Sequence, residues 1–108
     1  MNNHSPKLTK RKLRELAAIA YEKEMEAHLH ELLKSFERWK KGKLNVFQLD
    51  ELIHKYHDIK ARESYKAYNG LDHKMFIVRA VSSGILQEAD IPEDIRDSIM
   101  KVVEILKE

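Results

Sequence analysis

The feature that most constrains this fold is a run of 34 residues, from Lys7 to Lys40, without glycine or proline. Its apolar residues recur every three or four positions, which is typical of one face of an amphipathic helix. That stripe comprises Leu13, Ala17, Tyr21, Met25, Leu29, Leu32, Phe36 and Trp39. An unbroken helix of this length would measure about 50 Å. Since this is long for a chain of 108 residues, we expect one end to project or the first turns to fray.

The clearest break in the chain follows at Gly42, which can adopt the left-handed conformation that ends a helix. Asn45 and Gln48 then match a capping box and predict a second helix from about Val46 to Tyr68. Its predicted buried side is Leu49, Leu52, Ile53, Tyr56, Ile59 and Tyr65. The short connection through Gly42 predicts an antiparallel helical hairpin.

Two shorter helices are predicted in the remaining sequence. Asp72 can cap one that is apolar on nearly all sides from Met75 to Val81, and therefore central in the core; Pro92 can open the other. The predicted fold class is all-α, a small antiparallel four-helix bundle with a long first helix. Residues 1–6 are predicted to be a flexible N-terminal tail, and residues 7–108 a single helical domain.

Composition excludes several functional classes. The absence of cysteine rules out disulfides, thiolate metal ligands and cysteine catalysis. No apolar run approaches the roughly 20 residues of a membrane-spanning helix, and no signal peptide follows the basic start. We therefore expect a cytoplasmic protein without a membrane partner. No cofactor is predicted. The sequence contains no nucleophile elbow and no phosphate-binding loop, so no such motif indicates an enzyme.

A polar row on the second predicted helix has two interpretations. It comprises Asp50, Glu51, His54, His57, Asp58 and Arg62. Because residues four apart are neighbours on a helix, the row is typical of an exposed ladder of weak ion pairs. The alternative is a metal-binding or acid–base site, since Glu51 and His54 have the Glu-x-x-His spacing of di-iron bundles.

Such a site would also need ligands from the first helix, where Glu22, Glu26 and His30 form a row. Carboxylate and imidazole together suit zinc or iron. A di-iron site needs two Glu-x-x-His motifs and the chain has one, so we assign no metal and no catalytic residue. Burial distinguishes the two interpretations. A site requires Glu51, His54, His57 and Asp58 to lie partly buried, facing Glu26 and His30 of the first helix, whereas a ladder requires exposure.

A second alternative is weak nucleic-acid binding through the basic N-terminal segment from Lys7 to Arg14. The segment lacks interleaved aromatic residues, and a straight first helix would place it far from Lys40, Lys41 and Lys43. Nucleic acid is therefore not an expected partner. A net charge of +2 requires no polyanion either.

The leading hypothesis is contact with another protein or self-association as a homo-oligomer. The long first helix carries more apolar positions than three shorter helices can cover, and an uncovered stripe favours association. We expect Trp39, Tyr65 and Tyr68 to close the ends of the core. Removal of the residues before Leu16 is expected to lower the oligomeric state.

Overall fold

The chain folds entirely into helices and their connections over the residues that the computed structural model describes, 6–107. The elements are α1 (Pro6–Lys40), α2 (Val46–Lys55), the π-helical segment η1 (Tyr56–Ala61), α3 (Arg62–Gly70), α4 (His73–Ser82), the 3₁₀ helix η2 (Glu88–Asp90) and α5 (Glu93–Lys107). No strand occurs within this range, and contacts join α1 to α4 and α4 to α5. The predicted all-α helical bundle is confirmed. The predicted tail lies outside the described residues except for Pro6, at which α1 begins.

The predicted hairpin turn is confirmed. Gly42 has φ = 76°, and the backbone N–H of Lys43 donates to the carbonyl of Arg38 at 2.9 Å, which closes the end of α1. The capping box then starts α2. The Gln48 backbone N–H donates to Asn45 Oδ1 at 2.8 Å, and the Asn45 backbone N–H donates to Gln48 Oε1 at 2.9 Å.

We expect replacement of Asn45 by alanine to destabilise the start of α2 by about 1 kcal/mol, because the Gln48 N–H loses its acceptor. Hydrogen exchange of the amides in the first turn of α2 measures this local loss. Asn45→Ser retains a side-chain oxygen and is the matched control. Equal protection in the alanine and serine variants would contradict the capping role.

The helices α2, η1 and α3 form one continuous rod, because the residues at both joints keep right-handed helical dihedral angles. We call this rod, residues 46–70, the second rod, since it follows α1 in the chain. The π-helical segment inserts one extra residue into this rod. Compared with a regular α-helix, the residues after the segment are rotated by about 100° about the rod axis. As a consequence Ser64 turns inward and is 1% exposed, while Ile59 and Tyr65 turn outward and are 47% and 59% exposed. The predicted burial of Ile59 and Tyr65 was wrong for this reason.

The core lies at one end of the molecule, where α4 and α5 pack against the first half of α1. Its buried residues are Leu16, Ala17, Ala20, Phe76, Ile77, Val78, Ala80, Leu86, Ile91, Ile95, Ile99 and Val103. The central position predicted for the third helix is confirmed, since α4 buries side chains on several sides. We call α4 and α5, with the parts of α1 and α3 that they contact, the head.

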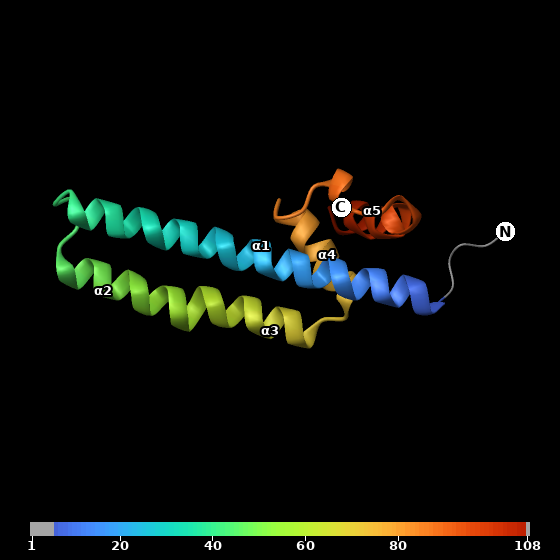
Figure 1. The fold of residues 1–108 in the computed structure, drawn as a ribbon, viewed down its shortest axis with the longest axis horizontal. Coiled ribbons are helices and arrows are strands. Elements are labelled where there is room, and N and C mark those ends of the chain that lie inside the picture. Colours follow the sequence, from blue (N-terminus) through green and yellow to red (C-terminus); the bar gives the residue numbers. More distant parts are fainter. Residues whose placement is uncertain (1–5, 108) are drawn as a thin grey trace.

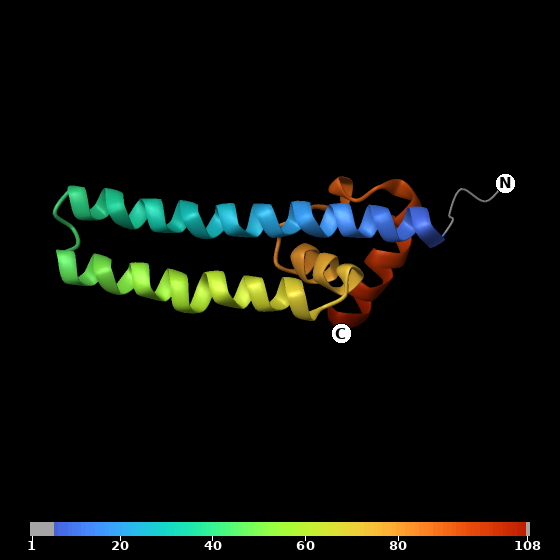
Figure 2. The same cartoon turned by 60° about the horizontal axis from the view of Figure 1, so that its bottom comes forward.

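The remaining part of the hairpin projects from the head as an arm, which we define as residues 25–60. Figures 1 and 2 show that α4 and α5 lie at the opposite end of α1 from the turn. The molecule is accordingly elongated, with principal extents of 62 × 24 × 22 Å. The first helix projects at its C-terminal end and not at its basic N-terminal end. There Lys12 forms an ion pair with Asp94, and Leu13 packs on the core.

The aromatic residues do not close both ends of the core as predicted. Trp39 lies at the far end of the arm and is 42% exposed. Tyr68 packs in the head, where its ring stacks on Tyr21 with centroids 4.5 Å apart and meets the edge of Phe76 at 5.2 Å. Within the described part of the chain, no helix has the length and apolar character to cross a membrane.

Candidate interaction surface

The predicted polar row begins on an exposed face of α2. His54 Nε2 lies 3.4 Å from Asp50 Oδ2, and both side chains are about two-thirds exposed. Glu51 is similarly exposed and lies 3.4 Å from Lys55 Nζ, one turn further along. These pairs have the one-turn spacing of a solvated ladder, and each contributes at most a few tenths of a kcal/mol.

The second part of the row borders a shallow hollow between α1 and the second rod. His57, Asp58 and Arg62 are exposed and line it, and Tyr21 and Met25 contribute its α1 side. Asp50, Glu51 and His54 are not among the residues that line this hollow. The structure therefore divides the six-residue row between two surfaces.

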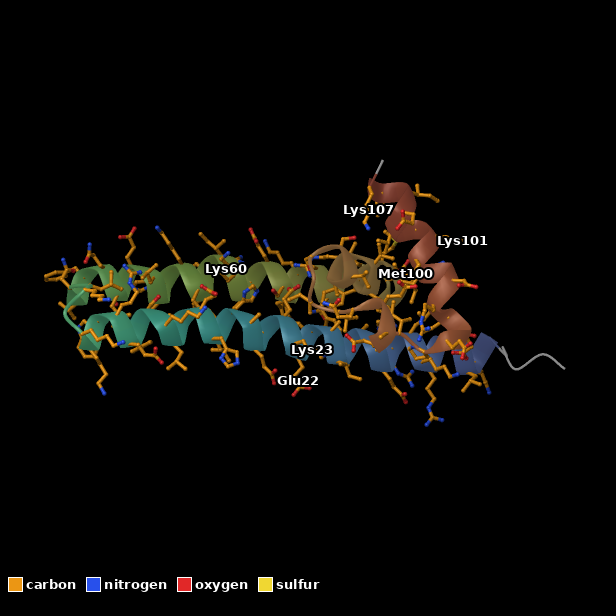
Figure 3. All side chains as sticks on the ribbon, turned by 90° about the horizontal axis from the view of Figure 1, so that it is seen from above. Glu22, Lys23, Lys60, Met100, Lys101 and Lys107 are labelled. Atoms are coloured by element: carbon orange, nitrogen blue, oxygen red, sulfur yellow. The ribbon has the colours of Figure 1, made fainter. Side chains whose placement is uncertain are left out.

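The side chains expected to face the row do not meet it. Glu22, Glu26 and His30 are exposed on α1, and Figure 3 shows Glu22 on the side of α1 away from the second rod. Among residues 6–107, no three histidine, aspartate or glutamate side chains are placed to hold a metal ion together. The partial burial that distinguishes a site from a ladder is not found, because Glu51, His54, His57 and Asp58 are all exposed.

Two polar contacts on the inner side of α1 were not foreseen. Arg79 Nη1 on α4 donates to Oε1 of the buried Glu24 at 2.6 Å, and Glu24 Oε2 has no hydrogen-bond partner among the described atoms. His28 Nε2 lies 2.9 Å from the buried Ser64 Oγ. Both contacts join α1 to neighbouring helices, so they position the head and the second rod.

The basic groups at the two ends of α1 remain separate. Lys7, Lys10, Arg11 and Arg14 border a shallow hollow near the N-terminal end, while Lys40, Lys41 and Lys43 surround the turn at the other end of a helix about 50 Å long. As expected for a straight first helix, these two groups form no joint basic surface.

An aligned set of exposed apolar side chains lies on the arm. Leu29, Leu33 and Phe36 on α1 are 49%, 53% and 37% exposed. At 3.6 residues per turn they fall within about 60° of one another, so they form a single stripe. Leu33 is nine residues, or two and a half turns, from Glu24, so the stripe lies on the opposite side of α1 from α4.

The stripe continues into the hollow described above. Met25, which lines the hollow, is one turn from Leu29, and the exposed Val46 and Phe47 lie near the turn at the far end of the arm. A two-helix arm has only one internal contact, so each helix leaves an apolar side without a neighbour. We call Leu29, Leu33 and Phe36 the arm stripe.

Comparison of the chain with protein-family models, with curated proteins and with solved structures gave no match.

Proposed function

We propose that this protein acts by self-association, and that the arm stripe is the surface through which two copies meet. The observation that supports this most directly is the stripe itself, three large apolar side chains on one side of a helix that keep 37–53% of their surface exposed. Exposed leucines scattered singly need no explanation, whereas aligned ones at helical spacing are typical of helix–helix association.

The occupant is proposed to be a second copy because the arm is complementary to itself in charge. Glu22 and Glu26 precede the stripe on its own side of α1, and Lys40 follows it. Another copy therefore offers an apolar stripe of equal length with lysine where the first has glutamate. Two two-helix arms that meet in this way would form a four-helix bundle, in which each arm gains the second layer that it lacks alone.

The cytoplasmic location and the absence of a catalytic role expected from the sequence remain part of this proposal. A metal-binding or acid–base function is not included, because its residues are exposed and divided between two surfaces.

Sedimentation equilibrium over a range of concentrations tests the proposal. We expect a mass above 12.8 kDa that increases with concentration, and we expect Leu33→Glu to restore the mass of a single chain, because it places a charge in the centre of the stripe. Since Leu33 is half exposed in one copy, circular dichroism should show the variant folded.

Ile105→Glu is the matched control, because Ile105 is 66% exposed but lies on α5. It should associate like the original chain. A single-chain mass for the original protein at every concentration would overturn the proposal, and an equal loss of association in both variants would move the contact away from the arm stripe. Removal of the residues before Leu16 is not a suitable test, because Leu13 packs on the core and Lys12 pairs with Asp94.

A further inference from the structure

The geometry points to an antiparallel pair in which the two α1 helices cross at Leu33, related by a two-fold axis through that residue. This inference rests on the proposed self-association and specifies its register. It follows from the spacing of three residues. Glu26 and Lys40 each lie seven residues, close to two full turns, from Leu33, so all three occupy one side of α1.

A two-fold axis through Leu33 exchanges the two ends of this row. Residue 26 of one copy then lies opposite residue 40 of the other, so glutamate meets lysine at both ends of the contact. Within residues 6–107, neither Glu26 nor Lys40 forms an ion pair in its own chain. Each is therefore available to a second copy.

The apolar side chains fit the same register. Leu33 lies on the axis and meets its own counterpart, while Leu29 and Phe36, four and three residues away on either side, come to lie beside each other across the pair. The half-exposed surfaces of these side chains would be covered by residues of the same kind. The apolar centre thus lies between two rims of opposite charge, as in self-complementary interfaces.

A parallel pair is disfavoured by the same charges. It would place Glu26 beside Glu26 and Lys40 beside Lys40, and like charges in such positions oppose association.

The head does not obstruct the antiparallel arrangement. Glu24, which contacts α4 through Arg79, is on the opposite side of α1 from Leu33. Figure 3 shows Glu22, eleven residues or about three turns from Leu33 and thus on the same side, pointing away from the second rod and from α5. A second arm can therefore lie along this side of α1 without meeting α4 or α5 of the first copy.

Single-cysteine variants test the register directly, because the chain contains no cysteine of its own. Packed helix axes are about 8–10 Å apart, so a short bis-maleimide can join facing positions. We expect Leu33→Cys to cross-link to itself, whereas Glu26→Cys and Lys40→Cys, each alone, should not. An equimolar mixture of the latter two should give a mixed dimer, identified by intact mass.

The control is Glu31→Cys, which replaces an exposed residue on the other side of α1 and should stay uncross-linked in every combination. Self-cross-linking of Glu26→Cys or Lys40→Cys would overturn the antiparallel register while leaving self-association in place. Sedimentation of the same samples separates the remaining outcomes. A dimeric mass without any cross-link at these positions would also overturn the register, and a single-chain mass would overturn the proposed function itself.

Discussion

Replacement of Phe76 by alanine is expected to lower the free energy of unfolding by about 3–5 kcal/mol. The Phe76 side chain is fully buried and joins α4 to both helices of the hairpin. Its ring meets Tyr21 of α1 edge-on at 6.2 Å and Tyr68 of α3 at 5.2 Å. Truncation leaves a cavity among three helices and removes two favourable aromatic contacts. Because a domain of this size is stable by about 5–15 kcal/mol, the loss would be a large fraction of the total.

Urea unfolding followed by circular dichroism, at a concentration where the protein is a single chain, measures this effect. Phe76→Leu keeps most of the volume and should cost about 1.5 kcal/mol or less. An alanine variant that unfolds within 1 kcal/mol of the original chain would mean that α4 does not depend on this ring.

The second large effect is expected at the buried ion pair between α1 and α4. Arg79→Met should destabilise the protein by about 3 kcal/mol, because it leaves the Glu24 carboxylate, only 5% exposed, without its cation. This loss of unfolding free energy should exceed the loss caused by Glu24→Gln. In the Glu24→Gln variant, the Arg79 side chain is still 35% exposed in its native position and can be solvated by water.

Arg11→Met provides the comparison, since Arg11 pairs with Glu15 on the surface at the same kind of contact distance, 3.0 Å, with both side chains more than half exposed. Its cost should stay within about 0.5 kcal/mol. Equal urea midpoints for the Arg11 and Arg79 variants would contradict this prediction, because they would mean that burial of Glu24 does not increase the contribution of Arg79 to stability.

Much of the helical architecture could be predicted because its signals are local. Gly42 and the Asn45–Gln48 capping box define the hairpin turn through backbone conformation and short-range hydrogen bonds. Asp72 likewise caps α4 by accepting from the Met75 backbone N–H at 2.8 Å. Each of these depends on residues within five positions of one another, so sequence alone specifies it.

The phase of the second rod could not be predicted, because a π-helical segment has no comparable local signal. A regular 3.6-residue period places Ile59 and Tyr65 on the inner side, yet both are outside, and the small polar Ser64 is buried in their place. The pairing of Ser64 with His28 joins residues 36 positions apart. Only the packing of α1 against the rod determines which phase is adopted.

The candidate surface was predicted in kind but not in position. An excess of apolar residues on the first helix was visible from Leu13 to Trp39, but the sequence does not say which half α4 and α5 will cover. They cover the half that includes Leu16, Ala17 and Ala20, where small residues allow close packing. The bulkier Leu29, Leu33 and Phe36 are left uncovered.

The π-helical segment also determines which insertions and deletions the hairpin can tolerate. The arm packs through one side of the second rod and the head through another, and the one surplus residue between Tyr56 and Ala61 accommodates both. A deletion there would restore a regular helix and rotate Tyr68 by about 100° away from Phe76. Elsewhere in the arm, gain or loss of a paired seven-residue segment in each helix would change its reach while keeping every side in phase. The hairpin is thus tolerant of length changes in steps of two turns, and intolerant of a single residue at its midpoint.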